Sequence, residues 1–225
     1  MMISMDIRHP DIEAFVKMKQ NLTKVTGANV SVKISDSFMQ AVENNDTFTL
    51  QFPVDAEEPE YTMDVDAVSL WNTIIESATK TAEPGLLMWD NIIKNLPAHN
   101  YPGFETKTTN PCGEIPLSAY DSCRLISLNL KNLVKNPFEK IADFDFSKLK
   151  QIASIGMRLS DDLVELELEK LQNIQRVADS DDEKSLWKKL YEAASNGRRT
   201  GLGTHGLADA IACLNLAYDS PEALV

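Results

Sequence analysis

The sequence has few of the residues that build disulfide frameworks, metal centres or membrane spans. It contains three cysteines and three histidines in 225 residues. An odd and small cysteine count argues against a secreted disulfide framework, and the scattered histidines offer no close pair of metal ligands. No apolar run reaches the length of a membrane span, and the opening MMISMDIRHP lacks the unbroken apolar stretch of a signal peptide. We therefore expect a cytoplasmic chain with no membrane partner.

Basic residues are also fewer than acidic ones. The chain has 22 lysines and arginines and 34 aspartates and glutamates, which gives a net charge of −12. The field of such a chain repels the phosphate backbone, so we expect no nucleic-acid partner. Oriented backbone N–H groups can still hold a small anionic ligand locally. The apolar content of 43% is ordinary for a globular protein with a sizeable core.

The first part of the chain alternates helical and strand patterns. Ser35 and Asp66 are good N-caps, so each is expected to open a helix. The run GLLMWDNIIKN at 85–95 fits either a strand or a helix. The remaining predictions here are a helix at 10–20, strands at 29–34 and 48–52, and a solvated acidic loop at 56–60.

The second part predicts one strand and three helices. Apolar residues on both faces of 124–130 indicate a strand buried on two sides. A long amphipathic helix is expected at 146–175, with Leu149, Ile152, Ile155, Leu159, Leu163 and Leu166 on its inner face. Shorter helices are expected at 183–194 and from about 206, and the acidic run 179–184 is interpreted as a solvated loop. No repeat or linker divides the chain, so residues 1–225 are predicted to form a single α/β unit.

The stretch TNPCGEIPLSAYDSCRLISLNL, residues 109–130, suggests chemistry rather than packing. Two prolines and a glycine interrupt any helix. In an extended segment Asn110, Cys112 and Glu114 would line one side, at a spacing of roughly 6 to 7 Å. Pro111 favours this conformation, and Gly113 lets another molecule approach the backbone. An amide, a thiol and a carboxylate would then face one site.

These residues also resemble a known family. The run NPCGE followed by SCRLISLNL is similar to the catalytic finger loop of the ribonucleotide reductase large chain, and most similar to its adenosylcobalamin-dependent, class II branch. The segments ISMDIRHPDIEAFVKMK, ANVSVKISDSFMQAV and GRRTGLGTHGLADAIACL resemble the same family in the same order. The resemblance covers essentially the whole chain. It implies an α/β fold that is part of a ten-stranded α/β barrel, with a central finger loop carrying the radical cysteine.

The resemblance implies a role for each residue of this loop. Cys112 would form the thiyl radical that removes the 3′ hydrogen of a ribonucleotide. Glu114 would take the 3′-hydroxyl proton as general base. Asn110 would hold the ribose hydroxyls, and Pro111 and Gly113 would complete the substrate-binding segment. The implied activity is reduction of ribonucleotides to deoxyribonucleotides.

The resemblance further implies that Cys123 is one of two thiols that supply reducing equivalents and end as a disulfide. Its family partner would precede residue 1, and the phosphate-binding segment would follow residue 225. We therefore expect the central portion of a reductase barrel that needs flanking reductase fragments and a thiol reductant such as thioredoxin. Two alternatives stay open. In the first, the chain is an inactive complementation or folding module of a split reductase. In the second, it is a class I large subunit that binds no cofactor and receives its radical from a metal-bearing partner subunit.

The same cysteines have simpler interpretations. Cys112 would be a buried structural thiol in many proteins, but its proline and glycine neighbours and the ordered flanking segments favour chemistry. Cys123 sits at the mouth of a strand, where cysteines often only pack, and its spacing from Cys112 favours the redox role. Cys213 lies on the apolar face of a predicted helix and is expected in the core.

Other motifs lack their context. Residues 201–206, GLGTHG, match a dinucleotide fingerprint, but a helix end and two arginines precede them where an apolar strand is required. We interpret these glycines as a tight turn where a strand meets its helix. Pro111 and Cys112 begin the PCxxC pattern of zinc deaminases, but Ile115 stands at the second cysteine position and no HxE occurs. A cysteine hydrolase using Cys112 and His205 stays open on sequence alone.

Overall fold

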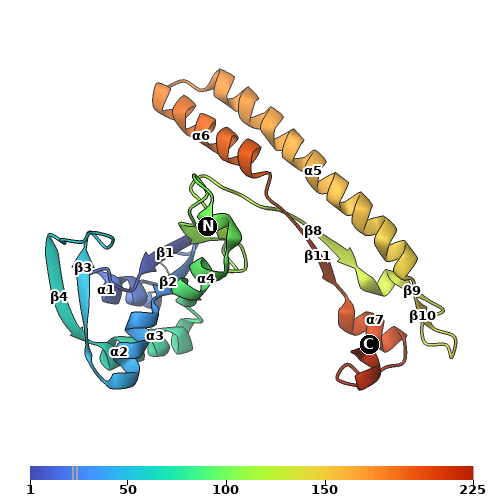
Figure 1. Ribbon diagram of the computed structural model, residues 1–225, viewed down its shortest axis with the longest axis horizontal. Coiled ribbons are helices and arrows are strands. Elements are labelled where there is room, and N and C mark those ends of the chain that lie inside the picture. The colour runs from blue at the N-terminus through green and yellow to red at the C-terminus, as the bar shows by residue number, and fades with distance from the viewer. Residues whose placement is uncertain (22, 24, 225) are drawn as a thin grey trace. The chain divides into compact units, whose positions relative to one another are not determined.

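The computed structural model describes residues 1–21, 23 and 25–224, which divide into two compact units (Figure 1). The first unit is Met1–Ala119, and the second begins at Tyr120. Each unit is described by itself below. The prediction that residues 1–225 form a single unit stays a prediction.

The first unit contains a parallel sheet with its helices, two hairpins and two short 3₁₀ turns. Its elements are β1 (Met2–Asp6), α1 (Ile12–Lys17), η1 (Met18–Gln20), β2 (Asn29–Ile34), α2 (Asp36–Asn44), β3 (Thr47–Phe52), β4 (Tyr61–Asp66), α3 (Ala67–Thr81), β5 (Gly85–Met88), α4 (Trp89–Asn95), η2 (Pro97–Asn100), β6 (Thr108–Thr109) and β7 (Pro116–Leu117).

The sheet of the first unit has β2 in the middle, with β1 and β5 parallel to it on either side. The predicted strand at 29–34 is confirmed as β2. Its alternation places Val30, Val32 and Ile34 in a core completed by side chains from α1, α2 and α3. Ser31 and Lys33 therefore lie on the opposite face, which is polar.

Both predicted N-caps are confirmed. Ser35 Oγ accepts a hydrogen bond from the Phe38 N–H at 3.2 Å, and Asp66 Oδ1 accepts one from the Ser69 N–H at 2.6 Å. The helix predicted at 10–20 appears as α1 followed by η1. The run 85–95, which fitted either a strand or a helix, contains one of each, because β5 ends at Met88 and α4 begins at Trp89.

The strands of the first unit that were not predicted include β1 and β4. β1 pairs with β2, and β4 pairs with β3 in an antiparallel hairpin whose register runs from Thr47 opposite Asp66 to Phe52 opposite Tyr61. The sequence of β4, YTMDVD, does alternate apolar and polar residues. Most of β4 is exposed, so little burial supports the strand.

The second unit contains a parallel strand pair, a helical hairpin, a short antiparallel ladder and a small C-terminal helix. Its elements are β8 (Arg124–Asn129), η3 (Leu130–Leu133), β9 (Val134–Lys135), β10 (Asp143–Phe144), α5 (Phe146–Val177), α6 (Asp181–Gly197), β11 (Thr200–His205), α7 (Leu207–Cys213) and η4 (Pro221–Ala223). Figure 1 shows α5 and α6 side by side, and they share a small apolar cluster around Val164, Leu168 and Leu171.

The long helix was predicted with the wrong inner face. Its buried residues are Gly156, Ser160, Val164, Leu168 and Leu171, whereas the predicted inner residues Ile155, Leu159, Leu163 and Leu166 are 36–59% exposed. Leu149 and Ile152 are partly buried against the cluster that includes Leu130 and Leu133. The reason is close approach. A Cβ on Gly156 would lie 3.0 Å from Leu202 Cδ1, so a small residue must face the strands.

Two further expectations for this unit were wrong. Strand 124–130 was expected to be buried on both sides, yet Leu125 is 59% exposed. Among the described residues this sheet has only β8 and β11, and α5 covers one of its faces. The acidic run 179–184 is a loop only at its first two residues, because Ser180 caps α6 by accepting from the Glu183 N–H at 3.1 Å and the helix begins at Asp181. Acids in a first helical turn are favoured by the helix dipole.

The architecture is therefore a mixture of helices with parallel and antiparallel strands, as the α/β prediction required. The described residues form one three-stranded and four two-stranded sheets and no closed barrel. The ten-stranded barrel stays a prediction. Across the described part of the chain, no helix combines the length and apolarity needed to cross a membrane.

Candidate functional site

The NPCG sequence forms a tight turn at the tip of a hairpin. β6 pairs with β7 in antiparallel fashion, and the Gly113 N–H donates to the Asn110 carbonyl at 3.0 Å. Asparagine at the first position, proline at the second and glycine at the fourth are the residues that a type I turn prefers. Gly113 has φ +88°, a conformation that side chains with a Cβ rarely adopt.

This turn corrects the extended segment expected from the sequence. Residues 111 and 112 occupy turn positions, so the alternation that would place Asn110, Cys112 and Glu114 on one side does not apply. The Asn110 Oδ1 atom accepts from the Ile115 N–H at 2.9 Å, and the Asn110 N–H donates to the Ile115 carbonyl at 3.0 Å. Asn110 thus braces the turn with its amide oxygen. Its amide NH₂ group is not engaged by any described residue.

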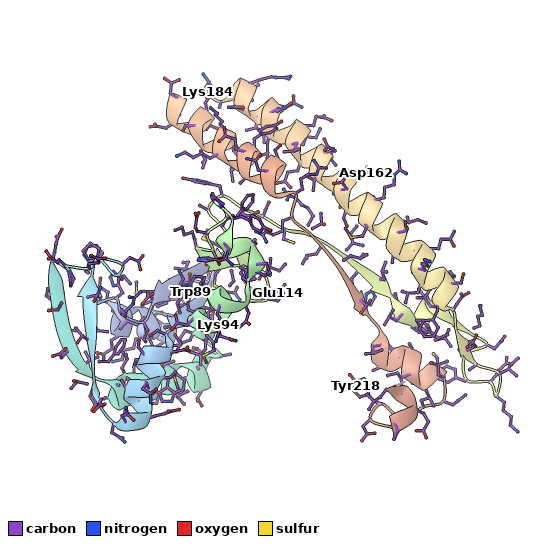
Figure 2. The ribbon with its side chains drawn as sticks, in the orientation of Figure 1. Trp89, Lys94, Glu114, Asp162, Lys184 and Tyr218 are labelled. Carbon is purple, nitrogen blue, oxygen red and sulfur yellow. The ribbon has the colours of Figure 1, made fainter. Side chains whose placement is uncertain are left out.

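Cys112 and Glu114 are both exposed on this hairpin, and Figure 2 labels Glu114. Cys112 lies at the rim of a cavity of about 250 Å³. The tip of the hairpin forms one side of the cavity, and the beginnings of β2 and β5 with the segment before β5 form the others. The lining residues are Asn29, Val30, Ser31, Ala82, Glu83, Gly85, Leu86, Leu87, Pro111, Cys112 and Gly113.

The base of the hairpin is tied to the polar face of the sheet. Ser4 Oγ lies 2.9 Å from Thr108 Oγ1, and Lys33 Nζ donates to the Lys107 carbonyl. Burial lowers the pKa of Lys33, and the ammonium also lies 4.3 Å from the centroid of the Trp89 ring. These contacts from β1 and β2 hold the hairpin over the sheet, which places the thiol of Cys112 at the cavity.

The one charged residue among the cavity's lining residues is already paired. Glu83 Oε1 accepts from the Val30 N–H at 2.8 Å, and Glu83 Oε2 lies 2.8 Å from Lys19 Nζ. The Lys19 and Glu83 side chains are 15% and 22% exposed. The described residues of the cavity wall therefore offer a thiol, a hydroxyl and backbone groups rather than a cation.

Cys123 belongs to the second unit, directly before β8, and is half-buried. Its Sγ atom lies 3.7 Å from the position that a Cβ on Gly201 of β11 would take. Two ion pairs stabilise the start of this strand. Arg124 pairs with Glu167 of α5, and Arg199 Nη2 lies 2.8 Å from Asp121 Oδ2. The two ion pairs thus fix the backbone on either side of Cys123.

The structure also locates the remaining candidate residues from the sequence. Cys213 is 1% exposed in α7, which confirms it as a core residue. His205 Nδ1 lies 2.9 Å from Ser127 Oγ across the β8–β11 pair. The glycines of GLGTHG were expected in a tight turn, but Gly201 and Gly203 lie within β11, and only Gly206, with φ +72°, forms the turn into α7. Among the described residues, no cluster of three or more His, Cys, Asp or Glu side chains could hold a metal ion.

Sequence reasoning missed Ser31, Glu83 and Gly85 as lining residues. The alternation of NVSVKI does indicate that Ser31 faces away from the valines. Nothing local indicates which segment covers that face, because the covering hairpin begins more than 70 residues later.

Comparison with known proteins decides the family. The model of the ribonucleotide reductase barrel domain matches residues 1–225. The chain belongs to the ribonucleotide reductase family. Its relatives include the vitamin B12-dependent ribonucleoside-diphosphate reductases of Mycobacterium tuberculosis, 31% identical over 99% of this chain, and of Thermoplasma acidophilum, 33% identical over 98%. The ribonucleoside-diphosphate reductase large subunit of variola virus is 26% identical over 99%. The chain spans 26–29% of the length of these three relatives.

Proposed function

We propose that this chain carries the radical cysteine of a ribonucleotide reductase, and that Cys112 is that residue. The observation that supports this most is the position of its thiol, which is exposed at the tip of a tight turn and borders a cavity. A thiol that must meet both a radical source and a substrate needs such access. A buried thiol such as that of Cys213 could meet neither.

The proposed reaction begins at C3′ of the ribose. The thiyl radical of Cys112 takes the 3′ hydrogen atom, which restores the thiol and leaves a carbon radical. Glu114 accepts the proton of the 3′-hydroxyl, and the 2′-hydroxyl leaves as water. Two thiols supply two electrons and two protons, of which one proton leaves in the water and one hydrogen remains at C2′. Glu114 and Cys112 then return the proton and the hydrogen atom to the 3′ position.

Three observations support these proposed roles. The exposed carboxylate of Glu114 is able to exchange protons with solvent between turnovers. The amide oxygen of Asn110 is occupied by the turn, so this residue would bind a ribose hydroxyl through its NH₂ group. Cys123 would be one of the two reducing thiols, positioned by the ion pairs that order the start of β8.

The class II relatives favour adenosylcobalamin as the radical source. When bound, this cofactor would supply the radical that oxidises the thiol of Cys112. The exposure of that thiol at the hairpin tip fits a radical donor that approaches from outside the first unit. The same exposure would serve a metal-bearing partner subunit, which is the class I alternative suggested by the similarity to the variola virus large subunit.

We also propose that both units belong to one ten-stranded barrel, with the hairpin as its finger loop. The pairs β1–β2–β5 and β8–β11 are parallel, which suits strands of an α/β barrel. Their outer edges lack partners among the described residues, and barrel closure would remove such edges. Flanking reductase segments would supply the missing strands, and a thiol reductant such as thioredoxin would reduce the disulfide after turnover.

The test is turnover in an assembly of the full chain with flanking reductase segments, adenosylcobalamin, a dithiol and a ribonucleoside diphosphate. Cys112→Ser should reduce deoxyribonucleotide formation to the level of the assembly without this chain. Cys213→Ala is the matched control, because that thiol is 1% exposed, and it should retain turnover. Full turnover by Cys112→Ser would refute the assignment.

The same experiment separates the alternatives. Turnover by the chain alone would exclude the view that it is an inactive complementation or folding module. Turnover only in the mixture would support that view of the isolated chain. Turnover with an iron-bearing radical subunit in place of adenosylcobalamin would favour class I.

A further inference from the structure

The floor of the cavity beside Cys112 is a serine hydroxyl without a protein partner. Ser31 is 5% exposed, on the central strand β2, and it lines the cavity. Among the described residues no group hydrogen-bonds its Oγ atom. The buried serines Ser77 and Ser160 differ, because Gln20 donates to the first and the second donates to the Gly156 carbonyl. The Ser31 Oγ atom is not fully buried but is open to the cavity, so a hydroxyl that no described residue bonds is available there to a ligand.

Gly85 keeps this hydroxyl uncovered. It lies opposite Ser31 in the parallel pair β2–β5. A Cβ on Gly85 would be 2.7 Å from Ser31 Oγ. The φ angle of Gly85 lies outside the left-handed region, so the backbone itself does not require glycine here. The requirement is space next to the hydroxyl.

The cavity suits a sugar better than a phosphate. None of the described lysines and arginines lines it, and the one carboxylate among its described lining residues, Glu83, is already paired with Lys19 and the Val30 N–H. A neutral, hydroxyl-bearing group therefore fits the wall, with phosphates and base outside.

We propose that Ser31 Oγ hydrogen-bonds a ribose hydroxyl of the ribonucleotide and holds the sugar at Cys112. This inference rests on the proposed function. Ser31 is a positioning and specificity residue in this scheme, and Gly85 is the neighbour that keeps its hydroxyl accessible. The pair lies on the sheet, while the reacting thiol lies on the hairpin that covers it.

The test is equilibrium binding to the full chain in the absence of a radical source, so that no turnover occurs. The probes are cytidine diphosphate and its 2′-deoxy and 3′-deoxy analogues, followed by calorimetry. Ser31→Ala should weaken binding of cytidine diphosphate about tenfold, the effect of one hydrogen bond. The penalty should disappear for the analogue that lacks the bonded hydroxyl.

Two further variants provide controls. Ser77→Ala removes a buried hydroxyl that is bonded to Gln20 and does not line the cavity, so it should lower the melting temperature and leave affinity unchanged. Ser31→Ala breaks no internal hydrogen bond and should leave the melting temperature unchanged. Gly85→Ala should displace the hydroxyl and weaken binding. In the Ser31→Ala background it should add little, because the nearest remaining atom is Ser31 Cβ at 3.7 Å.

Several outcomes would overturn the proposal. They are no binding of cytidine diphosphate, unchanged affinity in Ser31→Ala, an equal penalty with both deoxy analogues, or a fall in melting temperature that accounts for the loss of affinity. None of them concerns turnover through Cys112. Failure of this inference is therefore distinguishable from failure of the proposed function.

Discussion

Replacing Gly113 by alanine should strain the turn that presents Cys112, and the chain contains a matched control. Gly113 has φ +88° and Gly103 has φ +84°. A Cβ on Gly113 would meet only Leu87 Cδ2, at the ordinary contact distance of 3.5 Å, and one on Gly103 would meet nothing within 4 Å. The two substitutions thus impose the same backbone penalty with no clash, but only one of them lies beside the thiol.

The magnitude follows from the backbone alone. A residue with a Cβ in the left-handed region costs about 1–2 kcal/mol. Each variant should therefore lower the free energy of unfolding by about that amount, which is ~2–4 °C in melting temperature per kcal/mol at this chain length. Gly27→Ala serves as the opposite control. Its φ lies outside the left-handed region, and a Cβ there meets nothing within 4 Å, so the variant should be neutral or more stable by about 0.4–1 kcal/mol.

The assay combines urea unfolding with alkylation of Cys112 by iodoacetamide, measured on its peptide by mass spectrometry. Cys213, which is 1% exposed, provides the internal reference. A ribonucleoside diphosphate should slow alkylation of Cys112 in the wild type and in Gly103→Ala, and should slow it less in Gly113→Ala. Equal stability of Gly113→Ala and the wild type, beside a destabilised Gly103→Ala, would refute the turn geometry.

Two other predictions concern the stability of each unit. Phe38→Ala should lower the free energy of unfolding in urea by about 3–5 kcal/mol, because the ring is 0% exposed and packs edge-on against Phe48 with 5.0 Å between ring centroids. The control Phe52→Ala, at a 49% exposed position, should lower it by less than about 1 kcal/mol. Similar losses in the two variants would contradict the assigned core. The hydrogen bonds from Lys135 and from the Lys148 N–H lower the pKa of Asp145 below 3.8, so this carboxylate contributes stability above that pH and loses it as the pH falls through its lower folded pKa. Asp145→Asn should flatten this part of the acid-unfolding curve followed by circular dichroism, and an unchanged curve would be inconsistent with the pairing.

The features predicted correctly from sequence are those with a local cause. β2 was predicted because Val30, Val32 and Ile34 alternate with polar residues, and the starts of α2 and α3 because Ser35 and Asp66 satisfy helix N–H groups. The burial of Cys213 followed from the apolar face of its helix. In each case the residues that make the decision lie within one or two turns of each other.

The NPCG turn is also predictable from the residues of the turn itself. Its residues match the positional preferences of a β-turn, and that signature carries more information than the tendency of a residue before proline to be extended. Ser180 and Glu183 likewise form the spacing of a helix cap, which outweighs the acidity of the run around them. In both cases a specific local hydrogen-bond pattern decides the structure, and the compositional tendency does not.

The inner face of α5 was beyond local reasoning. The hydrophobic stripe through Ile155, Leu159 and Leu166 is stronger than the stripe that is buried, which begins with Gly156 and Ser160. A helix that is apolar on two faces is typical of one that is covered on both. Within the second unit only the face with the small residues meets β8 and β11, so the spacing of the partner strands, and not side-chain hydrophobicity, decides which face is buried.

The candidate site arises from the second face of the three-stranded sheet. A parallel sheet needs a cover on both sides, and α1, α2 and α3 cover the apolar one. The other face carries Ser4, Ser31 and Lys33, so its cover must supply polar partners. The hairpin does so through Thr108 and the Lys107 carbonyl but leaves Ser31 unmatched beside Gly85. The same contacts that attach the hairpin thus create a cavity with a hydroxyl at its floor and the thiol of Cys112 at its rim.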